Sequence, residues 1–598
     1  MCGFLGVVSK NKLNLSSEKS KNDFLICRGP DEYKCYDGEF SHLFNNHDFN
    51  HFVFQFNRLA ILDLSNKASQ PMISKDYKSI LMFNGEIFNH KELRTDLQKE
   101  GIQFYTNHSD SEVILNGLSV FGKYFIEKLR GQFAISYYDS KSNNLLLARD
   151  RLGQKPLFYK FDKENVRFSS NLKSLYDKNK DLVSERSIED YLNYGVVPSP
   201  NTIFKNIYKL KPAQIITFDL SKEVNVSSDN IYWKIEDYIM NEKFSKNEFF
   251  NLFSESIKIR ENADVDVATF LSGGIDSTSI VKNMSDRGSL TNTYSIGYVD
   301  SKYDESKWSS MVANKYKTNH DLNIVNFDND VDGVLNSMDI FDEPYSDPST
   351  YPSFLISKDI SNKYKVAISG DGGDELLGGY RRINILTNPD IRKSSIYKIL
   401  YDYYPNRFGT GSKLLTKSKD LLSSHTSFFS DKKLLDLLDI RDNNTFENDY
   451  WFEGNNIYKS ILITEYKFFL SEMMMLKVDR TSMANSLEVR SPFVDHKLIE
   501  YILSHEANYF QFDFQKSLLK KYLLDDFDKN FVNRDKKGFV FNVESFIYNN
   551  IDLVFDILNQ NYSGLNLKNI KKLKLVKSRV NALRIWRILF LERYLSSI

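Results

Sequence analysis

A cysteine directly follows the initiator methionine, and its position suggests catalysis. Removal of Met1 should be efficient because the second side chain is small, and it would leave Cys2 at the chain start. The α-amino group, with an unperturbed pKa of about 7.7–8.0, can take the thiol proton at neutral pH. The sequence therefore predicts a cysteine nucleophile that carries its own base.

Five motifs downstream of Cys2 add polar residues in a fixed order. They begin at Cys27, Asn57, Asn84, His108 and Leu147 and read CRGPD, NRLAILDLS, NGEIFNH, HSDSE and LARDRLGQKPLFY. With these motifs, residues 2–215 resemble the class II glutamine amidotransferases, which are N-terminal-nucleophile glutaminases.

The resemblance implies a role for each matching residue. Cys2 would attack the side-chain amide of glutamine and form a thioester. The Asn84 side chain and the Gly85 N–H would form the oxyanion hole, where negative charge develops. The free glutamine zwitterion needs a cationic and an anionic clamp. The residues that match those clamps are Arg58 for the α-carboxylate, and Glu86 and Asp110 for the α-ammonium.

A second constellation, residues 265–280, reads VDVATFLSGGIDSTSI, which predicts a strand, a glycine-rich turn and a helix. Glycines let the backbone approach phosphate oxygens, and the helix N-terminus adds partial positive charge. The segment lacks the Gly-Lys-Ser/Thr ending of a Walker A loop. It resembles the PP-loop of ATP pyrophosphatases, with Asp276 at the magnesium-associated position. Its matching residues are Ser272, Gly273, Gly274, Asp276 and Ser277.

Residues 368–380, ISGDGGDELLGGY, form a second glycine-rich turn that is strongly acidic. Such a turn beside a phosphate loop is unfavourable without a cation, so the pair implies Mg²⁺. We expect Asp374 to be the second metal carboxylate. Asp371 stands where many relatives carry a glutamate that acts as the base for the attacking nitrogen.

Further segments extend the resemblance along nearly the whole chain. They include YSIG at 294–297, DEPYSDPS at 342–349, KVDRTSM at 477–483, LEVRSPFVDH at 487–496 and RDKKGF at 534–539. Together they resemble the glutamine-hydrolysing asparagine synthetases. The resemblance implies ATP and Mg²⁺, an interdomain ammonia tunnel, and Lys536 on pyrophosphate. The remaining nucleotide-binding positions that it implies are Leu271, Ile296, Ser369 and Gly370.

The elements that must position these residues divide into two patterns. Alternating runs at 52–56, 79–83, 132–138, 144–148 and 165–169 predict antiparallel β layers, with a helix at 109–121. Apolar strands at 265–271, 293–297, 322–326 and 365–369 alternate with helical periodicity, which predicts a parallel sheet. Residues from about 390 onward are expected to be mostly helical. We expect an α+β (αββα sandwich) glutaminase domain at 2–215, a polar connector at 216–240 and an α/β Rossmann-like synthetase domain with a helical C-terminal part at 241–598.

Composition excludes several classes of protein. Lys plus Arg number 79 and Asp plus Glu number 79, so the net charge is zero, which is unlike a general nucleic-acid binder. Three cysteines exclude a disulfide scaffold, and no apolar run approaches the roughly 18 residues of a membrane span. We expect a cytoplasmic protein without a nucleic-acid partner. Many relatives dimerise, so a homodimer is possible.

The C-terminal region holds a basic amphipathic stretch that allows two interpretations. Leu573, Val576, Val580 and Leu583 recur with Lys and Arg between them. Such a stretch can lie on a membrane, or it can be a terminal helix docked on the core with a solvated basic face.

The expected activity is amide formation with glutamine as nitrogen donor. ATP would adenylate a carboxylate, and ammonia would displace AMP. Aspartate is the leading acceptor, which would give asparagine. A uronic-acid sugar is the alternative, favoured by Asp371 and by the segment 533–542. A PP-loop enzyme that modifies RNA and a catalytically inactive scaffold are the rivals from other classes.

Overall fold

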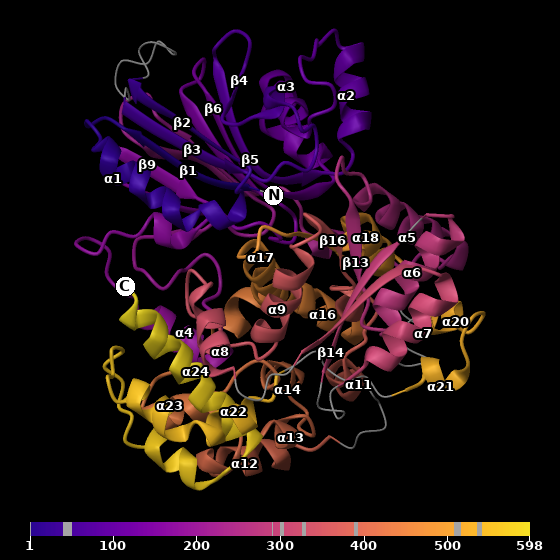
Figure 1. The fold of residues 1–598 in the computed structure, drawn as a ribbon. Coiled ribbons are helices and arrows are strands. Elements are labelled where there is room, and N and C mark those ends of the chain that lie inside the picture. The colour runs from indigo at the N-terminus through magenta and orange to yellow at the C-terminus, as the bar shows by residue number, and fades with distance from the viewer. Residues whose placement is uncertain are drawn as a thin grey trace.

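The computed structural model describes residues 2–39, 51–289, 291–298, 304–325, 330–387, 393–506, 516–534 and 541–598. The chain forms two stacked bodies (Figure 1). The first, indigo to magenta, contains the N-terminal strands. The second, magenta to yellow, contains a parallel sheet and the C-terminal helices. The chain start lies at the junction between them.

Two antiparallel six-stranded sheets build the first body, as the alternating runs predicted. Their strand orders are β10-β8-β9-β1-β3-β2 and β12-β11-β7-β6-β5-β4. The bounds are β1 Cys2–Ser9, β2 Glu32–Glu39, β3 His51–Arg58, β4 Met72–Ile73, β5 Ser79–Ile87, β6 Gly131–Asp139, β7 Asn144–Arg149, β8 Phe158–Phe161, β9 Asn165–Ser169, β10 Tyr208–Lys209, β11 Gln214–Asp219 and β12 Asn225–Ile231.

The two sheets pack face to face around an aromatic and aliphatic core. Phe4, Phe54, Met82 and Leu147 meet there, and Cys2 belongs to the same cluster. Inward side chains alternate along each strand because successive residues of a strand point to opposite faces. Helices cover the outer faces: α1 (Leu15–Ser20) on one side, α2 (His90–Lys99) and α3 (Asp110–Phe121) on the other (Figure 1).

The segment expected to be a connector differs from the prediction. Residues 216–231 extend β11 and form β12, and β12 pairs with β11 at the edge of the second sheet. Most residues of β12 are exposed or half-buried. An edge strand with two solvated faces carries no hydrophobic alternation, so its polar sequence looks like a loop.

A five-stranded, fully parallel sheet forms the centre of the second body, in the order β15-β14-β13-β16-β17. Its first strand, β13, is central, so the strand order reverses between β13 and β16. Open α/β sheets bind ligands at such a reversal, outside the carboxyl ends of the strands. The bounds are β13 Val267–Phe270, β14 Asn292–Tyr298, β15 Asn319–Val325, β16 Val366–Ile368 and β17 Glu488–Arg490.

Helices cover both faces of this sheet and then form a helical lobe, as expected (Figure 1). No helix in the described ranges is long and apolar enough to cross a membrane. The principal helices are α4 Glu185–Tyr194, α5 Lys246–Arg260, α6 Ile275–Asp286, α7 Ser306–Tyr316, α8 Val331–Asp339, α9 Thr350–Ile360, α10 Gly373–Leu376, α11 Arg381–Thr387, α12 Ile396–Asp402, α13 Ser412–Leu415, α14 Leu421–Thr426, α15 Lys432–Leu438, α16 Ile457–Thr464, α17 Met475–Met483, α18 His496–Ser504, α20 Ser517–Leu523, α21 Lys529–Val532, α22 Val543–Asn549, α23 Ile551–Leu558 and α24 Arg579–Ser596.

Candidate functional site: two centres joined across a domain interface

Cys2 begins β1 and is buried. Its backbone N–H donates a 2.9 Å hydrogen bond to Asn84 Oδ1 on β5. Asn84 Nδ2 is also buried and meets no hydrogen-bond partner in the described part of the chain. A buried donor without a partner costs free energy in the protein without substrate. A donor that binds an oxyanion only during the reaction is expected to be unpaired in this way. Burial raises the pKa of the Cys2 thiol, so a nucleophilic role requires a base within reach.

Gly85 occupies a backbone position that only glycine tolerates. Its φ is +149°, and a Cβ there would lie 1.9 Å from the carbonyl oxygen of Gln132 on β6. The strand can therefore pass close to its neighbour beside Cys2 only without a side chain.

Arg58, Glu86 and Asp110 gather around the same point from three elements. Arg58 ends β3 and is the cross-strand partner of Cys2. Its guanidinium donates 3.1 Å to the Ser65 carbonyl and lies 3.3 Å from Glu32 Oε2. The structure thus brings together all six residues predicted to act on glutamine.

The two carboxyl groups of this centre are strongly perturbed. Asp110 Oδ2 accepts the Ile87 N–H at 3.1 Å, and Glu86 Oε2 lies 3.2 Å from Arg490 Nη2. Burial raises the pKa of Asp110 to about 6, and burial raises the pKa of Glu86 well above its ordinary value. Two neighbouring buried carboxyl groups are expected to bind a cation, because a nearby positive charge lowers their pKa values and favours the ionised forms.

The predicted phosphate loop lies where β13 ends and α6 begins. Gly273 has a φ of +75°, and a Cβ there would approach the Ser309 nitrogen to 2.7 Å. Ser272 and Ser277 hydroxyls are 3.2 Å apart, and Ser272 Oγ accepts the Gly274 N–H at 3.2 Å. Because Gly274 caps α6, the first N–H groups of that helix lie directly beside the loop.

The acidic turn after β16 meets this loop, and one lysine joins them. The Lys516 ammonium contacts Asp276 Oδ2 and lies 2.6 Å from Asp374 Oδ1. Burial alone would lower the pKa of Lys516, but the two carboxylates outweigh burial and raise it. Two carboxylates from loops about 100 residues apart in sequence thus share one cationic position.

This pair of carboxylates fits a phosphate-bound Mg²⁺. A Cβ on Gly373 would lie 2.6 Å from Asp276 Oδ1, and one on Gly379 would lie 2.1 Å from Asp374 Oδ1, so glycines make room for both groups. No set of three or more His, Cys, Asp or Glu suited to a metal occurs within the described ranges. Mg²⁺ commonly takes one or two carboxylates and completes its shell with phosphates and water.

The remaining predicted nucleotide residues lie along the carboxyl edge of the same sheet. Leu271 follows β13, Ile296 lies in β14, and Ser369 and Gly370 follow β16. Ser369 Oγ is buried without a hydrogen-bond partner among the residues described. Asp371 is half-buried, and its carbonyl accepts the Ser491 hydroxyl. Lys536 lies outside the described residues.

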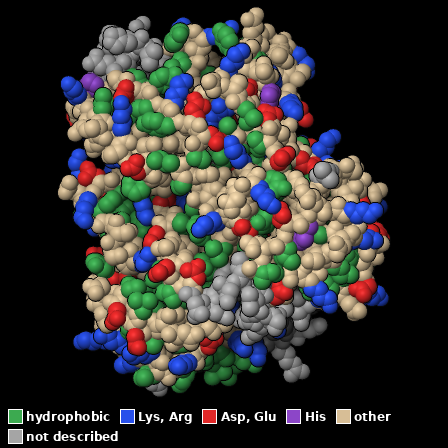
Figure 2. Space-filling model, viewed as in Figure 1, with side chains coloured by type: hydrophobic (Ala, Val, Ile, Leu, Met, Phe, Trp, Pro, Cys, Tyr) green, Lys and Arg blue, Asp and Glu red, His purple; other side chains and the backbone are tan. Residues whose placement is uncertain are grey.

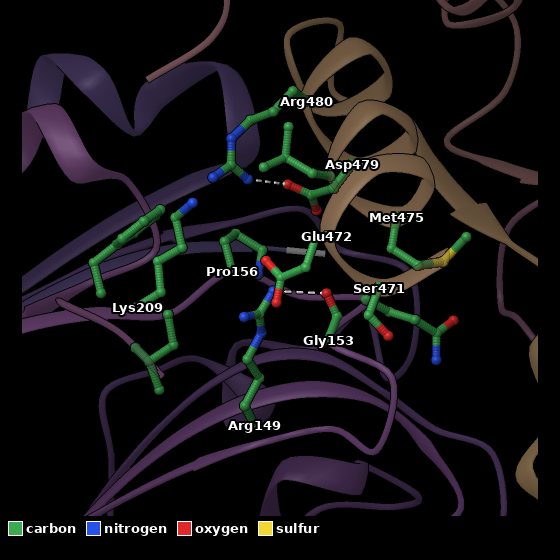
Figure 3. Close-up of a pocket in the computed structure, with 13 residues that line it drawn as sticks. Arg149, Gly153, Pro156, Lys209, Ser471, Glu472, Met475, Asp479 and Arg480 are labelled. Atoms are coloured by element: carbon green, nitrogen blue, oxygen red, sulfur yellow. Dashed lines mark hydrogen bonds and ion pairs between the residues drawn. The ribbon is translucent and has the colours of Figure 1, made fainter. Parts of the chain in front are cut away.

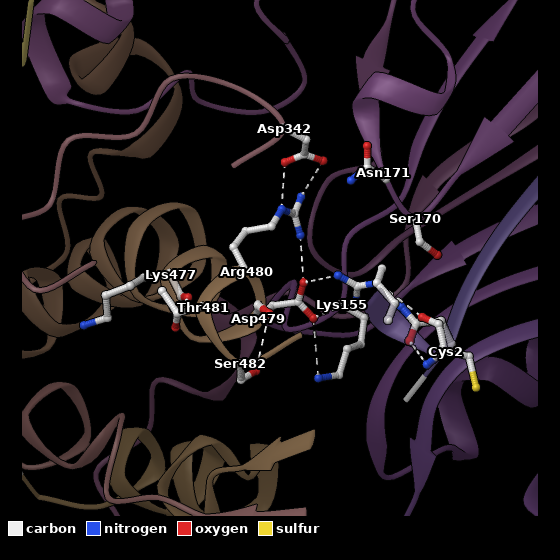
Figure 4. Close-up of polar contacts among 12 residues, drawn as sticks. Cys2, Lys155, Ser170, Asn171, Asp342, Lys477, Asp479, Arg480, Thr481 and Ser482 are labelled. Carbon is white, nitrogen blue, oxygen red and sulfur yellow. Dashed lines mark hydrogen bonds and ion pairs between the residues drawn. The ribbon is translucent and has the colours of Figure 1, made fainter. Parts of the chain in front are cut away.

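A buried ionic network joins Cys2 to helix α17 of the second domain (Figure 4). Arg28 Nε donates 3.2 Å to the carbonyl of Cys2, and the same guanidinium binds Asp479 of α17 at 2.8 and 2.9 Å. Arg480 binds Asp479 at 2.7 Å and also binds Asp342 at 2.7 Å. Lys155 approaches Asp479 to 3.9 Å. The nucleophile's backbone is therefore two side chains away from a helix of the other domain.

Strand β17 makes a second connection. Its Arg490 side chain is fully buried and reaches Glu86 in the first domain. Its Arg490 carbonyl accepts the Ser369 N–H at 2.9 Å, and the next residue, Ser491, binds the Asp371 carbonyl. One short strand thus touches both predicted centres.

Sequence reasoning missed Lys516, Arg490, Asp479 and Arg28 as parts of these centres. Arg28, Asp479 and Arg490 stand inside motifs that the resemblance used. The contacts that cross the domain interface, Arg28–Asp479 and Arg490–Glu86, join residues several hundred positions apart in sequence. A lone lysine such as Lys516 has no pattern that distinguishes it from a surface lysine, and only its burial reveals it.

A small cavity lies at the same interface (Figure 3). The first domain contributes Arg149, Pro156 and Lys209, and the second contributes Glu472 and Asp479. Asp479 therefore lines the cavity and also binds the arginine that contacts Cys2.

Comparison with known proteins agrees with this division. Residues 1–233 match the glutamine amidotransferase domain family, and residues 248–580 match the asparagine synthase family, which uses ATP as a substrate. A putative glutamine-hydrolysing asparagine synthetase 2 from Methanocaldococcus jannaschii is 34% identical over 64% of this chain and 76% of its own length. Asparagine synthetase 1 from Bacillus subtilis is 28% identical over 98% and 95%. The amidase chyE from Penicillium rubens is 26% identical over 81% and 80%.

With a glutaminase-type centre and an ATP-type centre in one chain, and with both family matches covering them, the chain belongs to the glutamine-hydrolysing asparagine synthetase family and is a glutamine-dependent amide-forming ligase.

Proposed function

We propose that the protein converts aspartate to asparagine, with the amide nitrogen of glutamine carried inside the protein to an aspartyl adenylate. The observation that carries the transfer between domains is the chain of contacts from Cys2 through Arg28 to Asp479, because it holds the nucleophile against the second domain. Aspartate as the acceptor is supported by the similarity to asparagine synthetases.

In the first half-reaction the Cys2 sulfur attacks the side-chain carbonyl carbon of glutamine. The proton of the thiol passes to the α-amino group at the chain start and then to the leaving nitrogen, which departs as ammonia. Asn84 Nδ2 and the Gly85 N–H stabilise the oxyanion. Water then cleaves the thioester and releases glutamate. The unpaired Nδ2 of Asn84 supports this assignment.

Arg58, Glu86 and Asp110 hold the glutamine backbone in this scheme. Arg58 binds the α-carboxylate, and the two acids bind the α-ammonium. The raised pKa values of both acids support the assignment, because a cation placed between them lowers the free energy of their ionised forms.

In the second half-reaction an oxygen of the acceptor carboxylate attacks the α-phosphorus of ATP, and pyrophosphate leaves. Ser272, the loop glycines and Ser277 bind phosphate oxygens, and Lys516 offsets their charge. Asp276 and Asp374 would hold Mg²⁺, which neutralises phosphate charge and orients the leaving group. Asp371 accepts a proton from the attacking ammonia, AMP departs, and the amide remains.

Transfer inside the protein matters because free ammonia is mostly ammonium at neutral pH and cannot attack. The two connections between the domains, through Asp479 of α17 and Arg490 of β17, support a protected path across this interface.

The test uses the purified full-length protein with glutamine, ATP and Mg²⁺. Aspartate is expected to yield asparagine, AMP and pyrophosphate in equal amounts. Cys2→Ala is expected to abolish glutamine use and preserve ammonia-dependent synthesis, whereas Cys35→Ala, which removes a thiol on β2, is expected to preserve both. Unchanged glutamine use by Cys2→Ala would remove the nucleophile assignment.

A second acceptor is supported by Asp371, one methylene shorter than the glutamate of many relatives. A shorter base leaves more room for a bulky carboxylate such as a nucleotide-linked uronic acid. If that acid yields AMP and an amide while aspartate yields neither, the acceptor is the uronate and the amidation chemistry stands. If no carboxylate yields AMP, the ligase assignment fails.

A further inference from the structure

A group of exposed cations lies outside both centres, in and around the 3₁₀ helix η12 (Ile570–Leu575). We name it the basic band, and it consists of Lys568, Lys571, Lys572, Lys574, Lys577 and Arg579, all exposed. No Asp or Glu occurs between Asp556 and Glu592. None of the six forms an ion pair within 4.0 Å in the described part of the chain. A protein of zero net charge therefore carries one locally positive surface.

This band is not the terminal helix. Helix α24 begins at Arg579 and is docked on the core through fully buried residues such as Trp586 and Leu589. The docked interpretation of the C-terminal stretch is therefore confirmed for α24. The lysine-rich part precedes the helix. Its Ile570 and Leu573 are fully buried in the core, so η12 is docked as well and presents its lysines to solvent.

Apolar side chains are exposed within and beside the band. Leu575 is 79% exposed in its centre. Helix α12 has no buried residue. Its Ile396, Ile399 and Leu400 are exposed, and so is Tyr403, which directly follows the helix. Soluble surfaces rarely gather large apolar side chains in this way without a binding purpose.

Helix α15 joins the band to α12. The Lys433 ammonium lies 4.7 Å from the centre of the Tyr401 ring, and Asn569 Nδ2 donates 3.0 Å to the Leu437 carbonyl. At 1.5 Å per residue, these two contact points on α15 are about 6 Å apart along its axis. Figure 2 shows blue side chains along the lower left edge of the molecule and green ones beside them at the bottom, where Figure 1 has α12.

We infer that the basic band and α12 form a docking surface for a membrane rich in anionic lipid. Lysines near such a surface are attracted by its negative potential, and exposed Leu, Ile and Tyr side chains enter the interfacial layer. The protein lies on the bilayer and does not cross it.

Other occupants fit this surface less well. A nucleic acid would use the cations but would leave the aliphatic side chains of α12 in water. A two-fold dimer through this face would set the cations of one copy against those of the other. An anionic lipid surface satisfies the charge and the apolar area together.

The primary experiment measures binding of the full-length protein to sedimenting vesicles. We expect binding to vesicles of phosphatidylglycerol and phosphatidylcholine, weakening with salt, and none to phosphatidylcholine alone. Each cation removed should weaken partitioning by about fivefold, so removal of four should weaken it by on the order of several hundredfold. The test variant combines Lys571→Gln, Lys572→Gln, Lys574→Gln and Lys577→Gln.

A matched control removes four exposed lysines that each have an acidic neighbour within 4.0 Å. It combines Lys99→Gln, Lys141→Gln, Lys163→Gln and Lys180→Gln. This control is expected to bind vesicles like the wild type. Neither variant touches the residues assigned to catalysis, so amide synthesis should be unchanged in solution.

A second experiment tests the apolar part. Leu575→Trp should show a blue-shifted emission component on anionic vesicles and quenching by brominated lipid, whereas Tyr77→Trp, at a site 60% exposed in the other domain, should show neither.

Three results would overturn the inference. They are equal binding of the band variant and the wild type, band-dependent binding of single-stranded RNA that is tighter than vesicle binding, and a solution dimer that the band variant dissociates.

Discussion

Replacing Asp479 by asparagine should loosen the contact between the two domains. Its carboxylate is 1% exposed and binds the Arg28 guanidinium through two bonds of 2.8 and 2.9 Å. Arg480 and Lys155 approach the same carboxylate. The asparagine amide carries no charge, so the buried cations Arg28, Arg480 and Lys155 would lose one neutralising carboxylate. Breaking one partner of a buried ion pair costs about 3–5 kcal/mol.

Hydrogen exchange of the backbone amides in α17 and at residues 26–28 measures this loss locally. A cost of about 3–5 kcal/mol corresponds to faster exchange by about a hundredfold to a few thousandfold. Asp96→Asn is the matched control. Its partner Lys99 and Asp96 itself are 70% and 69% exposed, so its effect should stay within about 1 kcal/mol.

A double variant separates charge from packing. Arg28→Met with Asp479→Leu replaces the pair by apolar groups, and it should exchange more slowly than Asp479→Asn alone because no unpaired Arg28 remains. Exchange of Asp479→Asn within threefold of the wild type, or no energetic coupling between the two sites, would refute the reasoning.

Three other predictions follow from the two centres. Lys516→Ala should lower ATP-dependent amide formation by at least about a hundredfold, because Asp276 and Asp374 lose their charged hydrogen-bond partner. Glutaminase turnover should persist. An equal loss of both rates would contradict the assignment of Lys516 to the adenylating centre. Gly85→Ala should abolish glutaminase activity and spare ammonia-dependent synthesis, because its Cβ would lie 1.9 Å from a backbone oxygen; retained glutaminase activity would contradict this. The KM for glutamine should rise by up to about tenfold per pH unit as the pH falls below about 6. Burial raises the pKa of Asp110 from 3.8 to about 6, and the protonated carboxyl group no longer attracts the ammonium group of glutamine. A KM that stays constant between pH 7 and about pH 5 would exclude that role for Asp110.

The raised pKa of Asp110 has an opposite consequence for folding. Burial in the folded protein disfavours the ionised carboxyl group more than the neutral one. Protonation of Asp110 therefore favours the folded state at low pH. That contribution is complete below about pH 4 and disappears as the pH rises through about 6. Glutamine binding, in contrast, needs the ionised form. Keeping Asp110 ionised and buried at neutral pH lowers the stability of the protein while the glutamine centre is empty.

Local sequence patterns predicted the elements around Cys2 and Asp276 well. Alternation marked β3, β5, β6, β7 and β9, and a strand followed by glycines and helical periodicity marked β13 and α6. These signals are local because side-chain direction in strands and helices repeats every two or about 3.6 residues. The polar edge strand β12 was mistaken for a connector because neither of its faces is buried.

The long-range ionic contacts could not be predicted in the same way. Arg28 meets Asp479, Lys516 meets Asp276, and each pair is separated by more than 200 residues in sequence. Any surface arginine could satisfy the same local pattern as Arg28, since a charge pair leaves no periodic trace. Only packing of the two domains identifies which charges are buried, and burial makes them important.

The proposed function requires nitrogen to pass from Cys2 to the adenylating centre without mixing with solvent. The direct measurement supplies glutamine labelled with ¹⁵N in its side-chain amide, together with an excess of unlabelled ammonium, ATP, Mg²⁺ and the carboxylate that the protein accepts. We expect most of the amide formed to carry ¹⁵N. A product whose ¹⁵N content equals that of the mixed ammonium pool would contradict it.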